Sequence, residues 1–162
     1  MFRTLLVLVA VTCAGPAAAS QISGQGKAID STTIQIDGQR IMLFGVDSVM
    51  RKQVCSLDGQ PWQCWPMAVR ILQSLLDPGP ATCDVVGEPD VFGRVLARCE
   101  VNGKSINEQL VSQGFAVARP SDTTEYVAAE IAAKALKIGL WRGQFLLPGD
   151  FRRSVGIAVE RP

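Results

Sequence analysis

The sequence predicts a single α+β domain with a small, strongly coiled β-sheet. The first observation is the order of the local patterns: three strands, a helix, two strands, a helix, a short strand and a helix. The second is size, since 162 residues with 48% hydrophobic and 19% charged side chains are typical of one globular domain with its own core. Five short strands with a helix after the third are compatible with an OB-type barrel.

The strands of the first block surround a tight turn. Alternating apolar residues predict strands over Ile22–Ile29, Thr32–Ile36 and Gln39–Val46. Asp37-Gly38, between the second and third of these strands, is a strong signal for a two-residue hairpin turn. A polar loop over Asp47–Gln60 is expected to follow the third strand.

A helix and a second hairpin come next. Apolar residues at helical spacing predict a helix over Pro61–Leu76, which the D-P-G-P run of Asp77–Pro80 stops. Two further strands are expected over Ala81–Glu88 and Gly93–Val101. They surround a turn at Pro89-Asp90 and therefore form an antiparallel pair.

The last two helices have recognisable ends. Ser105–Glu108 fits a capping box and opens a helix that runs to about Gly114. Asp122–Glu125 resembles another helix start, and Ala-rich sequence continues from there to Ile138. Gly139 is expected at the C-cap of this helix.

Composition excludes several functions. The chain has no histidine, so Ser-His-Asp and Cys-His catalysis, HExxH metalloprotease sites and Cys/His zinc sites are all excluded. The 16 basic and 15 acidic side chains exclude a strongly basic nucleic-acid binder of the usual kind.

The N-terminus has the pattern of a cleaved signal peptide. Arg3 precedes the apolar run Leu5–Ala14, and an Ala-Ala-Ala cleavage signal ends at Ala19. A transmembrane anchor is the alternative, but the run is about half of the ~20 residues that span a bilayer. Lipidation at Cys13 is a second alternative, which Thr12 disfavours.

We therefore expect an exported protein, periplasmic or secreted, without a stable membrane span. Residues 1–19 form the signal peptide, residues 20–153 form the domain, and residues 154–162 form a C-terminal tail. Cleavage removes one arginine and no acid, so the mature chain is formally neutral. A monomer is expected.

The four cysteines of the mature chain predict two disulfides, because an even number in an exported domain favours pairing. No C-x-x-C pair occurs, which weakens zinc and thioredoxin-type readings. If the second hairpin centres on Val91, Cys83 lies opposite Cys99 at a separation that suits a disulfide. Cys55 then pairs locally with Cys64. The larger bridge would contribute roughly 3 kcal/mol by loop closure.

Several stretches together resemble the staphylococcal nuclease (thermonuclease) family. Each is given with the family pattern that it resembles: 28–34 (V-x-D-G-D-T-I), 41–50 (I-R-L-x-G-I-D-A-P-E), 90–94 (D-x-Y-G-R), 107–116 (N-x-x-L-V-x-x-G-x-A), 126–130 (Y-x-x-A-E), 139–141 (G-L-W) and 148–152 (P-x-x-x-R). The match covers about residues 24–153 with order and spacing kept. The resemblance implies a five-stranded OB barrel with three helices.

The resemblance also implies a phosphodiester-cleaving site that is changed in this chain. Family nucleases hold calcium with two aspartates and a carbonyl, activate water with a glutamate, and stabilise phosphate charge with two arginines. Thr32 stands at the first aspartate, Met42 at the first arginine and Met50 at the glutamate. Asp47 and Arg94 are retained as the second aspartate and second arginine. Methionine neither accepts nor donates a proton and is a poor calcium ligand, so an impaired nuclease is expected.

The charged positions also have structural readings. Asp47 either caps a turn or keeps a cation contact, and Arg94 either forms a structural ion pair or binds an anion. Asp30 is read as a turn residue rather than as a ligand.

The apolar positions have two readings as well. Met42 and Met50 either fill a former active-site groove or form an apolar ligand patch. Trp62 and Trp65 are expected to pack around the disulfide of Cys64 rather than to stack bases.

Three functions remain open at this point. The first is a catalytically impaired module that binds nucleic acid, an envelope protein or a polysaccharide component, with no cofactor. The second is an active or weakly active DNA/RNA phosphodiesterase that uses Asp47, Arg94 and calcium. The third is a structural cell-envelope protein. The neutral charge argues against tight nonspecific DNA binding, although Arg51, Lys52 and Arg94 leave room for a local basic patch.

Overall fold

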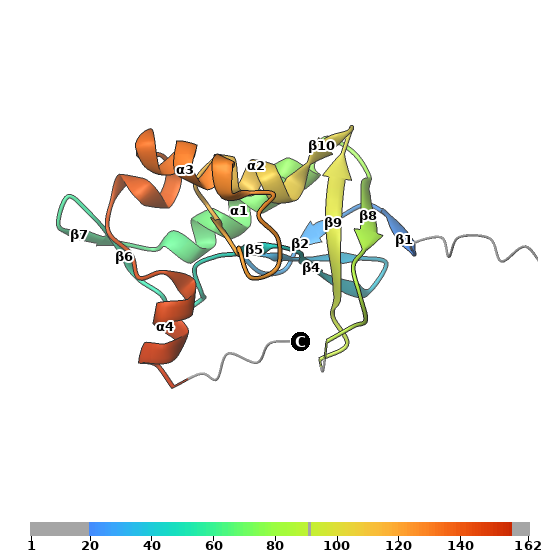
Figure 1. Cartoon of the computed structure of the whole chain (residues 1–162), viewed down its shortest axis with the longest axis horizontal. Helices are drawn as coiled ribbons and strands as arrows, with labels where there is room; N and C mark the ends of the chain where they lie inside the picture. The colour runs from blue at the N-terminus through green and yellow to red at the C-terminus, as the bar shows by residue number, and fades with distance from the viewer. Residues whose placement is uncertain (1–19, 91, 157–162) are drawn as a thin grey trace, which may run out of the picture.

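A curved sheet with helices over one side forms the frame of the molecule (Figure 1). The structure is a computed structural model and describes residues 20–90 and 92–156. The strands of the main sheet follow the order β1-β8-β9-β4-β3-β2, with β10 added to β9. Their bounds are β1 Gln21–Gly24, β2 Lys27–Ala28, β3 Thr33–Ile36, β4 Gln39–Leu43, β8 Ala81–Val85, β9 Val95–Val101 and β10 Lys104–Ser105. The α+β class expected from the sequence is confirmed.

The two edges of this sheet are halves of one chain segment. β1 pairs with β8 and β2 pairs with β3, yet only Gln25 and Gly26 separate β1 from β2. The strand expected over Ile22–Ile29 is thus present but interrupted. Since β1 and β2 belong to opposite edges, the sheet must curve strongly for both pairings to form. The Asp37-Gly38 hairpin is confirmed, and both residues have positive φ as a primed turn requires.

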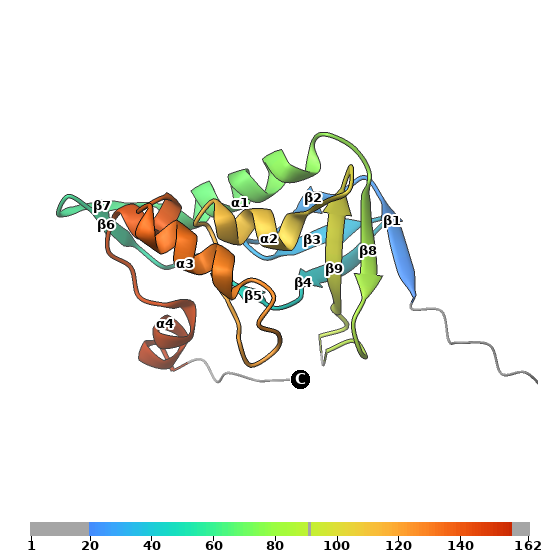
Figure 2. The ribbon, with the colours of Figure 1, turned by 45° about the horizontal axis from the view of Figure 1, so that its top comes forward.

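The core lies between the inner face of this sheet and two helices. β3 and β4 contribute Ile34, Ile36, Ile41 and Leu43, each no more than 1% exposed. Helix α1 (Cys64–Leu76) buries the row Ala68-Leu72-Leu76, because residues four apart share one helix face. Leu72 and Leu76 pack in the same cluster as the strand residues, and Ala68 packs in a second, smaller cluster. Helix α2 (Ile106–Ser112) lies beside α1 in both views and adds further apolar residues (Figure 2).

The cysteine hairpin forms as expected. β8 and β9 are antiparallel, with Cys83 opposite Cys99, and these two residues form a disulfide. Val91, the expected centre of the turn, lies outside the described residues. The other disulfide joins Cys55 to Cys64, so both predicted pairings are confirmed.

The expected loop over Asp47–Gln60 is wrong in its second half. Strands β6 (Cys55–Leu57) and β7 (Gln60–Trp62) form a hairpin there, and α1 consequently begins at Cys64 rather than at Pro61. Asp58-Gly59 makes the turn with positive φ at both residues, the same signal as Asp37-Gly38. Each strand has only three residues, which is too short for a periodicity search to detect.

The domain contains more helices than the three expected, because the C-terminal segment adds helices after α3. α3 spans Val127–Ala135, a 3-10 helix η1 spans Gly139–Arg142, and α4 spans Pro148–Ser154, which makes four α-helices in the described ranges. The expected start of α3 at Asp122–Glu125 is therefore early. α4 also includes Ser154, which had been assigned to the tail.

The C-cap expected at Gly139 is wrong. Lys137 takes the positive φ after α3, and the Ile138 amide donates back to the Ala133 carbonyl. Gly139 instead packs against the backbone of Gln113 and Gly114, where a Cβ atom has no room. This close contact joins the C-terminal segment to the end of α2.

The capping box of α2 is confirmed on one side, since the Ser105 Oγ accepts a hydrogen bond from the Glu108 amide at 3.2 Å. Behind it, Asn107 is fully buried and joins the backbone of β9 to the residue that follows β4. Its Oδ1 accepts from the Cys99 amide at 3.0 Å, and its Nδ2 donates to the carbonyls of Phe44 and Ala97.

Across the described ranges, none of the helices is both long and apolar enough to cross a bilayer.

Candidate functional site

One cleft gathers all five positions at which the resemblance implied a catalytic or metal-binding role. Thr32, Met42, Asp47, Met50 and Arg94 line it. The cleft is further lined by residues from several elements: Asp30, Ser31, Thr33, Val46, Ser48, Arg51, Phe92, Arg119 and Arg152. The structure therefore brings these positions together, and the role of each stays a prediction.

The central strand β4 explains why these positions meet. In the register of the sheet, Met42 lies between Thr33 of β3 and Leu96 of β9. Arg94 precedes Leu96 by two residues, and side chains two apart on a strand point to the same side. Met42 and Arg94 consequently share the outer face of the sheet, while Ile41 and Leu43 point into the core.

Asp47 is held by an arginine from the other end of the chain. It lies on β5 (Val46–Asp47), which pairs with β11 (Val117–Ala118). Its Oδ1 accepts hydrogen bonds from the Arg152 guanidinium at 3.1 Å and from the Ser48 amide at 2.9 Å. Its Oδ2 accepts a second hydrogen bond from the Arg152 guanidinium. The hydrogen bonds that Arg152 donates to Asp47 raise the pKa of Arg152 against the opposing effect of burial.

Arg94 is held by its own ion pair. Its Nε donates to the Asp90 carboxylate at 2.7 Å, and the Asp90 carboxylate also accepts from the amides of Phe92 and Arg94. Burial raises the pKa of Asp90, but the hydrogen bonds from Arg94 and Phe92 together outweigh it, so this pKa lies below its usual value. The carboxylate thereby orients the guanidinium at the edge of the cleft.

Two further arginines line the cleft. Arg119 pairs with Asp122 at 3.2 Å. Arg51 lies over the ring of Trp65, with its Cζ 4.7 Å from the ring centroid. Trp65 in turn donates from its Nε1 to Asp30 Oδ1 at 2.7 Å, and the same oxygen accepts from the Ser31 amide. Asp30 is thus engaged as a local turn residue.

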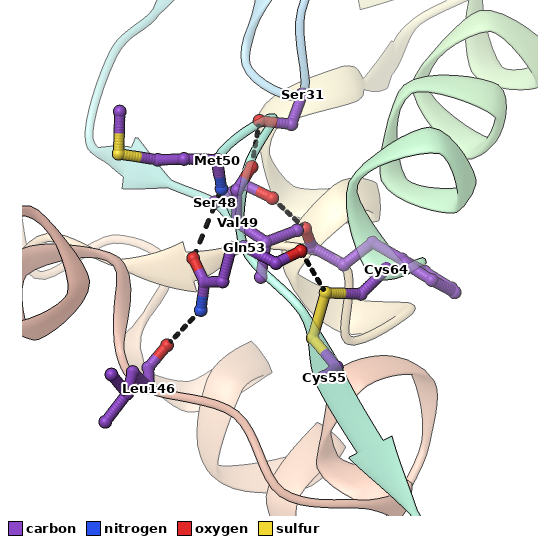
Figure 3. Close-up of a disulfide and its surroundings, with 9 residues drawn as sticks. Ser31, Ser48, Val49, Met50, Gln53, Cys55, Cys64 and Leu146 are labelled. Carbon is purple, nitrogen blue, oxygen red and sulfur yellow. Dashed lines mark hydrogen bonds between the residues drawn. A yellow bond between two sulfur atoms is a disulfide. The ribbon is translucent and has the colours of Figure 1, made fainter. Parts of the chain in front are cut away.

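Gln53 anchors the loop that carries Met50, as Figure 3 shows. Its side chain is 2% exposed; its Oε1 accepts from the Met50 amide at 3.2 Å, and its Nε2 donates to the Leu146 carbonyl at 2.6 Å. The Gln53 carbonyl oxygen lies 3.6 Å from Cys64 Sγ. A single buried residue therefore connects the cleft loop to the segment that precedes α4 through its side-chain amide, and to the disulfide of Cys64 through its backbone carbonyl.

Two serines complete the anchoring of this loop. The Ser48 hydroxyl donates to the Phe115 carbonyl at 2.6 Å, and the Ser31 hydroxyl donates to the Val49 carbonyl at 2.8 Å (Figure 3). Val49 itself is fully buried beside the disulfide. The loop is consequently held at both ends, which positions Met50 at the cleft.

The chemistry of the cleft is dominated by guanidinium groups. Its lining includes four arginines and two aspartates, and both aspartates are engaged in hydrogen bonds within the protein. Met42 and Met50 contribute half-buried thioethers. Across the described part of the chain, no three His, Cys, Asp or Glu side chains gather where they could hold a metal ion. This arrangement suits an anionic ligand.

Sequence reasoning missed three of these residues. Arg119 lies three residues after the end of the stretch that resembles N-x-x-L-V-x-x-G-x-A, and Arg152 ends the P-x-x-x-R pattern, so both lie in or near visible motifs. Gln53 had no signal at all, because a buried glutamine in a polar loop looks like any exposed one. Lys52, expected in a basic patch with Arg51 and Arg94, is not among the residues that line the cleft.

Comparison with known proteins agrees with this architecture. The family model described as "Staphylococcal nuclease homologue" matches residues 40–143. The chain is also 36% identical over 132 residues to the succinoglycan biosynthesis protein ExoI of Rhizobium meliloti (strain 1021). That alignment covers 78% of this chain and 68% of the relative. The chain therefore belongs to the staphylococcal nuclease homologue family.

Proposed function

We propose that this protein is an exported binding module that holds an anionic polymer in the cleft and hydrolyses it poorly or not at all. One observation carries the proposal: Met50 lines the cleft where the resemblance implies a water-activating glutamate. The two aspartates of the lining do not replace that base, because Arg152 engages Asp47 and Trp65 engages Asp30. Loss of a positioned base typically lowers a rate by about 10²–10⁴.

The charge of the cleft supports a ligand that carries phosphate or carboxylate groups. Four arginines line it, and arginine matches the geometry of both oxyanions. Nucleic acid and an envelope partner both offer such groups. The relative's name refers to succinoglycan biosynthesis, which favours a polysaccharide component among the envelope partners. The near-neutral chain limits nonspecific affinity, so contacts in the cleft must supply most of the binding.

A cleavage assay tests the catalytic part of the proposal. The oxidised protein is incubated with single-stranded DNA and with RNA, with and without calcium, beside an Asp47→Ala/Arg94→Ala variant. We expect no calcium-dependent cutting by either protein. Cutting by the wild type that the double variant loses would contradict the proposal.

A binding assay tests the other part. Affinity for single-stranded DNA and for an acidic polysaccharide is measured over a range of salt concentrations. Arg119→Ala should weaken binding and reduce the salt slope by about 1, because it removes one contact to an anionic group. Arg153→Ala is the matched control, since Arg153 is exposed and is not among the residues that line the cleft. Absence of binding at low salt would favour a structural envelope protein.

Export is the third part of the proposal. Two disulfides support it, since disulfides persist mainly in oxidising compartments. The mature protein recovered from its host should begin at Ser20, which N-terminal mass spectrometry would reveal. Recovery of the full-length chain from the reducing interior of the cell would contradict this part.

A weakly active calcium-dependent phosphodiesterase is the second candidate. It is favoured by one observation, that Asp47 and Arg94 line the same cleft. The cleavage assay above distinguishes it from a binding module, because both of these residues are removed in the control variant.

A further inference from the structure

The Asp47 carboxylate is already neutralised inside the protein. Both of its oxygens contact the Arg152 guanidinium, and the Ser48 amide adds a third donor. The two side chains are 17% and 19% exposed, so solvent screens their attraction only in part. The partners lie 105 residues apart in the sequence, and helix α4 alone brings the arginine to the cleft.

This donor set does not fit a calcium ion. Calcium takes six to eight oxygen ligands and prefers carboxylates. The cleft offers the Thr32 hydroxyl and the Met50 thioether at the other implied ligand and base positions, and neither side chain is charged. A divalent ion at Asp47 would also lie against the guanidinium of Arg152 and would be repelled by it.

We propose that Arg152 is a built-in cation that replaces the divalent metal, so the cleft binds phosphate or carboxylate groups through guanidinium groups alone. The anion-binding half rests on the proposed function. The metal-exclusion half does not rest on it, because exclusion of a metal ion concerns only Asp47 and Arg152 and needs no bound ligand.

The remaining donors of the arginines are available to such a ligand. A guanidinium has five N–H donors, and Arg152 uses its two terminal nitrogens towards Asp47, which leaves its Nε and the outer hydrogens free of that partner. Arg94 and Arg119 are anchored by Asp90 and Asp122, and neither carboxylate is among the residues that line the cleft. Anchored guanidinium groups lose little freedom on binding, which favours affinity.

Direct calcium titration by calorimetry tests metal exclusion on the oxidised mature protein. We expect no saturable calcium binding by the wild type, and the same result for Asp47→Asn. One calcium ion bound by the wild type and lost in Asp47→Asn would overturn the proposal. This measurement does not depend on any ligand, so it is decisive even if the proposed function fails.

Thermal melting tests the ion pair on which the proposal depends. Asp47→Asn and Arg152→Ala should each lower the melting temperature, and the double variant should melt no lower than the worse single variant, because the pair is already broken. Strictly additive shifts would overturn the proposal. Arg152→Lys keeps the charge and serves as the milder variant if Arg152→Ala does not fold.

Ligand binding tests the built-in cation itself. Single-stranded oligothymidylate and polyglucuronate are titrated in EDTA and again in calcium, which separates phosphate from carboxylate as the source of the anion. Affinity of the wild type should be the same in both buffers. Arg152→Ala should weaken it by about tenfold or more, because a hydrogen bond to a charged group is lost.

Arg153→Ala, one residue further along α4, should leave this affinity unchanged. Equal effects of Arg152→Ala and Arg153→Ala, or binding that requires calcium, would overturn the proposal. A wild type that binds neither polymer in either buffer would refute the proposed function and with it the anion-binding half.

Discussion

Two regions of this molecule are held together by different means. The sheet region, formed by the main sheet with α1 and α2, buries an apolar cluster of 18 residues. The cleft side, formed by residues 47–64 and the segment from Gly139 to Ser154, packs on a cluster of only five of the described residues, one of which, Ala68, lies outside these two segments on α1. It relies instead on the Cys55–Cys64 disulfide, the hydrogen bonds of Gln53 and the pair of Asp47 with Arg152.

This difference separates stability from function. Burial of apolar surface is non-directional and is shared among many residues, so the sheet region tolerates changes of its exposed polar residues. The disulfide, the hydrogen bonds and the ion pair of the cleft side are directional and involve one or two residues each. A single substitution therefore alters the geometry of the cleft. The loop that carries Met50 and the arginine that neutralises Asp47 can therefore change while the sheet stays folded.

The largest expected effect is on the sheet region. Leu43→Ala removes a side chain that is 1% exposed at the centre of β4 and should lower the free energy of unfolding by about 2–5 kcal/mol. Urea denaturation measures this change. Leu147→Ala is the control, since Leu147 is 44% exposed on the cleft side and should cost less than about 0.5 kcal/mol. Equal costs would remove the distinction between the two regions.

The next prediction concerns the pH dependence of stability. Tyr126, the chain's single tyrosine, belongs to the same apolar core, so its titration reports on that core. Burial, with a smaller contribution from Glu125, raises the pKa of Tyr126 to about 12, and its hydroxyl has no hydrogen-bond partner among the described residues. The unfolded chain loses this proton near pH 10, whereas the folded chain keeps it until about pH 12. Stability from this group is thus complete below pH 10 and falls, by at most about 3 kcal/mol, as pH rises towards 12.

Tyrosinate absorbance follows this titration without interference from other tyrosines. Tyr126→Phe should lack this part of the alkaline loss of stability and should be as stable as the wild type at neutral pH, because no hydrogen bond is removed. An ordinary pKa near 10 in the folded protein would show that the sheet region admits water at this position.

The disulfide of the cleft side provides the next comparison. Cys55→Ser/Cys64→Ser should lower the free energy of unfolding by about 2–3 kcal/mol, since the bridge closes a short loop. Cys83→Ser/Cys99→Ser should cost a similar amount. Only the loss of the Cys55–Cys64 disulfide should also weaken ligand binding in the cleft, because the Gln53 carbonyl lies against Cys64. Equal losses of binding would indicate that both regions position the cleft.

The smallest expected effect on stability is at Gln53. Gln53→Ala should cost about 1–3 kcal/mol, because it leaves the Met50 amide and the Leu146 carbonyl without partners. Hydrogen exchange should show faster exchange at residues 48–53 and unchanged exchange in β8 and β9. Gln39→Ala, at an exposed position of β4, is the control. Faster exchange throughout the sheet would mean that the two regions do not respond separately.

The elements that the sequence predicts well carry strong local signals. Asp37-Gly38 marks a hairpin because both residues tolerate positive φ, and Ser105 with Glu108 marks a helix start. The opposition of Cys83 and Cys99 follows from counting residues around one turn. The β6–β7 hairpin was missed although Asp58-Gly59 carries the same turn signal, because its strands have only three residues each and give too short a pattern.

The residues of the candidate site divide in the same way, into those that local motifs predict and those that they do not. The positions Thr32, Met42, Asp47, Met50 and Arg94 came from local motifs, and the structure brings all five to one cleft. Their partners did not come from those motifs. Whether Asp47 faces a metal ion or Arg152 depends on how segments 105 residues apart pack. The pair of Arg94 with Asp90 is local, since the two residues are four apart, but the motif that contains both does not by itself predict their contact.

The sequence by itself determined the α+β class, the two disulfide pairings, the family resemblance and the residue types at the site. These properties depend on turn chemistry, residue counts and side-chain identity, all of which act over short stretches of chain. Only the tertiary structure decided that Arg152 neutralises Asp47 and that Gln53 joins the cleft loop to the C-terminal segment. Contacts between residues about 100 positions apart leave no local pattern, because they form only when the curved sheet and α4 are both in place.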